Sequence, residues 1–275
     1  MNKLLTIIIG ILITQNAFAI NRIDITRGNP DPLPIAISEF IGASEEEREV
    51  GAEISRVISA DLERSGLFKI IDKAAYIDHL KTSSQLPKFS AWRQINAQGL
   101  AIGKTAIKGN EVEIEFRLWD PFNEKQVAGK IFTYNVNKWR RVAHKISDEI
   151  YKALTGEDGY FDTRIVYVAE SGPALKRIKR IASMDSDGEN HRFETDGKYL
   201  ALTPRFSPNA NQILYLSYAS RKPRVYIRDL YSGREKILGD FPGMTYAPRY
   251  SPDGNNVIMS AAYNGNSDIY EIDLK

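Results

Sequence analysis

Apolar residues follow two different periods along the first 160 positions of the chain. Apolar side chains occupy every second position from Val112 to Leu118, and charged side chains stand between them. This alternation predicts a half-buried β-strand, because successive side chains of a strand point to opposite faces of the sheet. A loop at residues 120–125 then leads to a second strand that carries Phe132 and Tyr134. The pattern therefore predicts two neighbouring strands joined by this loop.

Two longer segments follow the helical period. Ser44 and Glu47 match a capping box, which predicts the start of a helix whose apolar stripe covers residues 50–62. A second apolar stripe covers residues 139–154 and ends at Gly156, a residue type common just after helices. Both segments are predicted to bury one stripe and to expose a charged face.

Shorter segments complete the N-terminal half. Apolar residues predict strands at residues 34–40 and 68–71 and a helix at residues 74–80. The mixture of helices and strands predicts an α+β domain over residues 34–160.

The helical periods disappear after Tyr160, and a repeat takes their place. PRFSPNAN at residues 204–211 returns as PRYSPDGN at residues 248–255, 44 positions later. A period of about 40–45 residues with several short strands is typical of the blades of a β-propeller. A β-sandwich with accidental similarity is the alternative. Strands are predicted at residues 164–169, 212–218, 224–230 and 256–262.

An earlier and less regular unit precedes the repeat. Residues 164–168 resemble residues 212–216, but no Pro-Arg-aromatic-Ser-Pro element stands before them. The predicted fold is an α+β N-terminal domain followed by an incomplete all-β propeller at residues 161–275, with two blades and part of a third.

The first 19 residues have the layout of a cleavable export signal. Lys3 gives a positive start, the next ten positions are nearly all apolar, and Ala17 and Ala19 are small residues at the end. A membrane anchor is the alternative, but so short an apolar run does not span the ~30 Å hydrocarbon layer. We expect cleavage after Ala19, no integral membrane span and a periplasmic protein. Residues 20–33 are predicted to be an extended segment with a proline-rich tether.

Composition and motifs exclude several functional classes. A net charge of +2 does not support a nucleic-acid partner, and a chain without cysteine has no thiol catalysis or cysteine-bound metal. Gly103-Lys104-Thr105 resembles the end of a phosphate-binding loop, but Gln98 stands where that loop needs glycine, so a strand is expected. Neither G-x-S-x-G nor HExxH occurs.

The remaining candidates also have simpler interpretations. Residues 185–188 suggest a calcium loop, but the glycine comes fourth instead of sixth, so a hairpin turn is expected. His144 is expected on the solvated face of its helix, and the three tryptophans are expected in core or domain-seam packing. We predict no catalytic residue, no metal site, no cofactor and no small-molecule substrate.

The order of these pieces resembles the TolB family of the Tol-Pal system. The segments that carry the resemblance are Arg22-Ile23-Asp24-Ile25, Ser65-Gly66-Leu67-Phe68, Lys138-Trp139, Ser147-Asp148-Glu149, Leu154-Thr155-Gly156, residues 163–168 and the two Ser-Pro turns. The family has a six-bladed propeller, so this resemblance implies a C-terminally truncated member.

The resemblance implies a non-enzymatic adaptor that links TolA at the inner membrane to the lipoprotein Pal at the outer membrane. This link supports outer-membrane integrity and constriction during cell division, and colicins use the same propeller surface in some bacteria. The implied TolA-contacting residues are Ile20, Asn21, Arg22, Ile23, Asp24, Ile25, Thr26, Arg27 and Gly28. The implied Pal-contacting residues are Met244, Thr245, Ala247 and Arg249. The alternative function is the N-terminal fragment of a propeller-bearing periplasmic peptidase.

Overall fold

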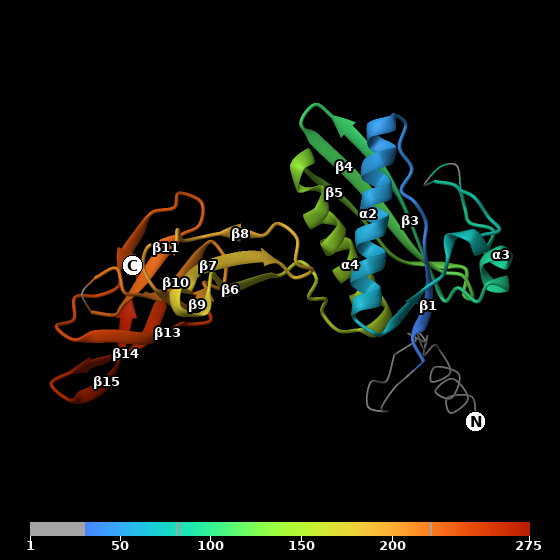
Figure 1. Ribbon diagram of the computed structural model, residues 1–275. Helices are drawn as coiled ribbons and strands as arrows, with labels where there is room; N and C mark the ends of the chain where they lie inside the picture. Colours follow the sequence, from blue (N-terminus) through green and yellow to red (C-terminus); the bar gives the residue numbers. More distant parts are fainter. Residues whose placement is uncertain (1–30, 81, 83, 221) are drawn as a thin grey trace, which may run out of the picture. The chain divides into compact units, whose positions relative to one another are not determined.

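The computed structural model of the protein describes residues 31–80, 82, 84–220 and 222–275. It divides into an N-terminal unit that ends at Phe161 and a C-terminal unit that begins at Asp162 (Figure 1). The predicted export signal lies outside the described residues. Among the described residues, no helix has both the length and the apolar content needed to cross a membrane.

The N-terminal unit contains a five-stranded sheet with the order β2-β1-β3-β4-β5. Strand β1 runs parallel to its two neighbours β2 and β3, and β4 and β5 extend the sheet in antiparallel fashion. On β4, the predicted alternation of buried and more accessible positions is confirmed. The strands are β1 (Leu33–Ile37), β2 (Phe68–Ile70), β3 (Gly99–Lys108), β4 (Glu111–Asp120) and β5 (Lys125–Asn135).

Two helices, α2 (Glu45–Arg64) and α4 (Trp139–Thr155), lie on one face of this sheet (Figure 1). The capping box is confirmed, because the Ser44 hydroxyl accepts from Glu47 N and the Glu47 carboxylate accepts from Ser44 N. Gly156 ends α4 with a φ of 80°, as its sequence position predicts. The apolar stripes of both helices and the inner face of β4 form one buried cluster.

The predicted strand at Gly103-Lys104-Thr105 is also confirmed, since all three residues lie within β3. Gly103 has a packing role here. A Cβ atom at this position would lie only 2.3 Å from the ring of Phe40. The glycine therefore lets this ring pack directly on the strand.

The helix predicted at residues 74–80 is wrong, because only a 3-10 turn forms there, η1 (Lys73–Ala75). Tyr76 has extended backbone, and its hydroxyl accepts from Ile37 N at 3.0 Å. Its ring meets Trp92 edge-on, with 4.9 Å between the ring centroids. These contacts with the sheet and with helix α3 (Phe89–Gln94) outweigh the local helical preference. Trp92 is buried as predicted.

The C-terminal unit contains three antiparallel sheets, which confirms propeller sheets after the α+β unit (Figure 1). The first sheet consists of β6 (Arg164–Ser171), β7 (Ile178–Asp185) and β8 (Arg192–Phe193). The second consists of β9 (Ala201–Phe206), β10 (Gln212–Ser217), β11 (Arg224–Asp229) and β12 (Glu235–Ile237). The third consists of β13 (Met244–Tyr250), β14 (Asn256–Tyr263) and β15 (Asn266–Asp273). A short 3-10 turn, η3 (Ala174–Lys176), connects β6 to β7, and another, η2 (Val136–Lys138), precedes α4 in the N-terminal unit.

The second sheet is buried on both faces. Ile213 and Tyr215 pack toward Ile181 of the first sheet. Leu214 and Val225 pack toward the third sheet. Face-to-face packing of successive sheets is the arrangement expected of propeller blades.

The Ser-Pro turns connect paired strands of these sheets. The Ser251 hydroxyl donates to the Asp253 carboxylate at 2.5 Å and accepts from Asn256 N at 3.0 Å. This donated bond is the main reason why the pKa of Asp253 falls to about 2. Gly254 has a φ of 75°, which confirms its predicted turn role. Residues 185–188 likewise form a hairpin turn, in which Gly188 N donates to Asp185 O at 2.9 Å.

Candidate functional site

The predicted partner-contacting segment at residues 20–28 lies outside the described residues. The other predicted contact residues lie on β13. Met244 is exposed there, but Thr245 is buried. The Thr245 hydroxyl accepts from Val225 N at 2.8 Å, and Thr245 N donates to Pro223 O at 3.1 Å. Thr245 therefore joins the third sheet to the second and is not accessible to a partner.

A bulge interrupts β13 directly after these residues. Its pairing with β14 shifts between Tyr246 and Arg249, and Ala247 has a φ of 52°. Ala247 and Arg249 are both exposed. The Arg249 guanidinium donates from Nη1 to Pro248 O at 2.8 Å, which fixes its direction close to the backbone. The bulge thus presents an exposed arginine on the same strand as an exposed methionine.

The same arrangement occurs on β9, which contacts β13. Thr203 lies 44 positions before Ala247 and has a φ of 50°, and Arg205 lies 44 positions before Arg249. Arg205 also donates from Nη1 to the preceding proline carbonyl, at 3.2 Å. Thr203 and Arg205 were not among the contact residues predicted from the sequence, although the 44-residue offset identifies both positions.

Positive φ at Thr203 is a marked backbone outlier, since β-branched residues rarely adopt this conformation. Such a conformation costs about 1–3 kcal/mol and occurs most often at functional sites. Within the described part of the chain, no acidic side chain forms an ion pair with Arg205 or Arg249. Two exposed arginines, with the exposed apolar side chains of Leu200 and Met244 five positions before them, suit the carboxylates and apolar groups of a protein partner. We call Leu200, Thr203, Arg205, Met244, Ala247 and Arg249 the bulge face.

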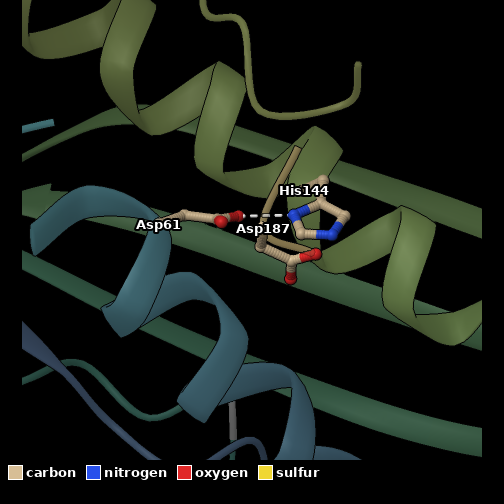
Figure 2. A group of neighbouring side chains, drawn as sticks. All are labelled: Asp61, His144 and Asp187. Atoms are coloured by element: carbon tan, nitrogen blue, oxygen red, sulfur yellow. Dashed lines mark hydrogen bonds and ion pairs between the residues drawn. The ribbon is translucent and has the colours of Figure 1, made fainter. Parts of the chain in front are cut away.

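The buried pair Asp61 and His144 is a second polar arrangement, within the N-terminal unit (Figure 2). His144 Nδ1 lies 2.7 Å from Asp61 Oδ2, and Arg64 Nη2 donates to Asp61 Oδ1 at 2.9 Å. The prediction of a solvated His144 is wrong, because the side chain is only 2% exposed. His144 can be buried because its imidazole contacts Asp61 of the facing helix α2, which lies 83 positions away in the sequence. The pair links α2 to α4, so we assign it a structural role.

A small cavity of about 230 Å³ lies in the C-terminal unit, lined by residues that include Tyr215, Arg228 and Glu235. The Tyr215 hydroxyl donates to Glu235 Oε2 at 2.6 Å, and Arg228 Nη1 donates to the same oxygen at 2.9 Å. Burial and, after it, the bond to Glu235 raise the pKa of Tyr215. A phenol held protonated in this way is a structural donor and not a general base.

Two family models match separate parts of the chain. Residues 21–127 match the TolB amino-terminal domain, and residues 151–275 match the TolB beta propeller domain, PD40.

Individual relatives give consistent results. The chain is similar to the "Tol-Pal system protein TolB" of Paramagnetospirillum magneticum, with 55% identity over 87% of this chain and 54% of the relative. The protein of the same name from Rickettsia bellii is 49% identical over 93% of this chain and 58% of the relative. The crystal structure of TolB from Acinetobacter baumannii superposes with a TM-score of 0.74 and 27% identity, over 92% of this chain and 61% of that one. The chain thus spans somewhat more than half the length of the curated relatives that it matches.

Proposed function

Because this chain belongs to the TolB family, we propose that it is a non-enzymatic adaptor of the Tol-Pal system. The observation that carries the proposal is the 55% identity to a Tol-Pal system protein over 87% of the chain. In this proposal the segment at residues 20–28 contacts TolA, and the bulge face contacts the lipoprotein Pal. The adaptor then links the inner membrane to the outer membrane and supports envelope integrity and constriction at division.

The chemistry of the bulge face supports a protein partner. Its exposed groups are two guanidiniums, apolar side chains and a bulged backbone, with no nucleophile and base placed together. Of the four residues first assigned to Pal, Thr245 is buried between sheets, so Met244, Ala247 and Arg249 remain as contacts. We add Arg205 and Thr203 to them because of their equivalent positions on β9.

The contact with Pal can be tested with charge reversals. We expect Arg249→Glu and Arg205→Glu each to weaken binding of purified Pal by at least about tenfold, because a carboxylate replaces the guanidinium at a desolvated contact. Isothermal titration calorimetry measures the dissociation constants. Arg234→Glu is the matched control, since Arg234 is exposed in a turn of the same unit, outside the bulge face. Equal affinities of all three variants and the parent would refute the assignment of Pal to this face.

The contact with TolA is tested by a deletion. We expect removal of residues 20–28 to abolish capture of purified TolA and to leave the circular dichroism spectrum unchanged. An extended segment adds a strand to an exposed sheet edge, so its loss removes the whole contact. Undiminished TolA capture by the deleted protein would contradict the assignment.

Export to the periplasm is part of the same proposal. Expression of the complete chain in a Gram-negative host should yield a periplasmic protein whose N-terminal sequence begins at Ile20, after cleavage behind Ala19. A protein that stays in the cytoplasm with its first 19 residues intact would contradict this location.

A further inference from the structure

The hairpin of β6 and β7 is longer than its two counterparts in the C-terminal unit. It covers residues 164–185, whereas the paired strands of the second and third sheets cover residues 212–229 and 256–273. The first hairpin therefore contains four residues more than either counterpart. Its ladder has eight residue pairs, and that of the second sheet has six. The two additional pairs lengthen the hairpin by about 7 Å of strand.

The loop of this hairpin, residues 172–177, lies beyond the paired strands. The last pair of the ladder is Ser171 with Ile178, so the loop belongs to neither face of the sheet. All six loop residues are exposed. Leu175, in the middle of η3, is 98% exposed. Its side chain therefore contributes almost no burial to the fold.

The conformation of the loop is fixed by its own backbone. Lys176 N donates to Pro173 O at 2.9 Å, and the ring of Pro173 restricts the φ of the residue that precedes η3. Gly172 has a φ of 88°, and a Cβ atom there would lie only 2.8 Å from Lys176 O. This closed turn holds Leu175 at its apex. A preorganised loop of this kind loses little conformational entropy when it binds a partner.

The loop and the strand after it are strongly cationic. Residues 176–180 contain four cations, and residues 170–180 contain a single carboxylate, Glu170, which gives this segment a net charge of +3. Arg177 Nε lies 3.2 Å and Lys179 Nζ lies 3.5 Å from the Glu170 carboxylate. Exposed ion pairs of this kind contribute little. Within the described part of the chain, no carboxylate pairs with the Lys176 ammonium.

The turn at the other end of β7 has the opposite charge. Residues 185–190 contain three carboxylates and no cation. The hairpin therefore has a cationic tip and an acidic turn at the far end of the same strand. Such a separation of charge orients a protein on a charged surface.

An exposed leucine among cations matches the surface of an anionic phospholipid bilayer. The apolar side chain enters the boundary between headgroups and acyl chains, and the cations remain at the lipid phosphates. An acidic protein would also attract the cations. Leucine is, however, an uncommon anchor in protein interfaces, whereas a bilayer accepts a single projecting apolar side chain without a matching pocket.

We propose that the loop at residues 172–177 attaches this chain peripherally to anionic phospholipid bilayers. Leu175 enters the bilayer surface, and Lys176 and Arg177 lie at the phosphates. The loop shares no residue with the bulge face. The proposal goes beyond the proposed Tol-Pal function and does not depend on it.

The first experiment measures co-sedimentation of the complete chain with vesicles of equimolar phosphatidylglycerol and phosphatidylcholine. We expect binding at low salt. The double variant Lys176→Glu, Arg177→Glu should weaken it by at least about tenfold, because each cation contributes to attraction by the anionic surface. Leu175→Ser should weaken it by at least about fivefold, because the apolar insertion is lost. The charge variant should leave binding to vesicles of phosphatidylcholine alone unchanged.

Tyr231 provides the matched control at the opposite end of these sheets. It is 100% exposed. The preceding Leu230 N donates to Asn211 O at 2.9 Å, and Arg164, the first residue of β6, donates to Ala210 O. The Tyr231 turn therefore lies near the start of β6, whereas the loop at residues 172–177 follows its end. Tyr231→Ser should bind vesicles like the parent.

A second experiment reports insertion directly. The chain has no cysteine, so Leu175→Cys carries a single environment-sensitive dye, and Tyr231→Cys carries the same dye as the control. We expect anionic vesicles to shift the emission of the dye at position 175 to the blue and to leave that at position 231 unchanged. Salt should reverse the shift, since the Debye length falls from about 10 Å at 0.1 M to about 3 Å at 1 M.

The variants share all residues before position 172, so differences between them report the loop, and circular dichroism verifies that each one folds. Equal vesicle binding by the parent, Leu175→Ser and the charge variant would overturn the proposal. A dye at position 175 that does not respond to anionic vesicles would overturn it as well. A parent chain that does not bind anionic vesicles would also overturn it and would leave an acidic protein as the partner of the loop.

Discussion

The Asp61 carboxylate lies in the last turn of α2, where the helix dipole disfavours negative charge. Arg64 and His144 both contact it, and the imidazole reaches it from the facing helix α4. At the scale of single residues, this contact is a buried polar link between the two helices. Its loss leaves a buried carboxylate with fewer partners.

We predict that His144→Ala lowers the unfolding free energy of the N-terminal unit by about 3 kcal/mol, the usual cost of removing one partner from a buried pair. Urea unfolding followed by tryptophan fluorescence measures this effect selectively, because Trp92, Trp119 and Trp139 all lie in the N-terminal unit. His79 is exposed, so His79→Ala is the control and should change the stability by less than about 0.5 kcal/mol. Equal stabilities of the two variants would show that the pair contributes nothing.

Glu47 connects whole elements, since it joins the start of α2 to strand β3. Its carboxylate accepts from Ile107 N at 2.8 Å, and also from Ala43 N and Ser44 N. The bond from Ile107 N, followed by that from Ser44 N, lowers the pKa of Glu47 below its ordinary value of 4.5. The ionised carboxylate therefore stabilises the fold at neutral pH.

We predict a pH-dependent stability from this contact. A lowered pKa means that the stabilisation is complete above about pH 4.5 and is lost as the pH falls through the lowered pKa. Glu47→Gln should remove this component, so that its stability falls less than that of the parent between neutral and acidic pH. The measurement is urea unfolding at several pH values. Glu46→Gln, in the same helical turn and exposed, should retain the parent's pH dependence. If Glu47→Gln retains it too, the carboxylate does not carry the effect.

The two units of the molecule differ in how completely their apolar faces are covered. In the N-terminal unit, α2 and α4 cover one face of the sheet, and α3 covers apolar residues of the other face near Trp92. In the C-terminal unit, the first and third sheets each leave apolar side chains exposed. Sheets of this kind depend on their neighbours for stability.

We predict that limited proteolysis of the monomer leaves a fragment close to residues 34–156 and cleaves the chain beyond residue 160. Mass spectrometry of the fragments measures the boundaries. Equal resistance of both units in the monomer would contradict the prediction.

Features that depend on a local period were predictable from the sequence. The alternation on β4, the capping box of α2, the Gly156 terminus and the Ser-Pro turns were all predicted correctly, because neighbouring residues decide them. The propeller sheets followed from the 44-residue repeat, and the same offset could have identified Thr203 and Arg205 of the candidate site. The site prediction included Thr245 because the sequence does not show which side of a strand faces another sheet.

Tertiary contacts decided the rest. Residues 74–80 have a helical pattern. However, the Tyr76 hydroxyl bonds to β1 and its ring contacts Trp92, and these contacts hold Tyr76 in an extended backbone conformation. His144 has a polar helix position, but a carboxylate from a helix 83 positions away makes it a buried residue. Ile258 and Ile269 lie 44 positions after the buried Leu214 and Val225 but are exposed, so the repeat alone does not decide burial. Hydrophobic periods record which faces a chain can bury, whereas contacts between distant segments determine which of them it does bury.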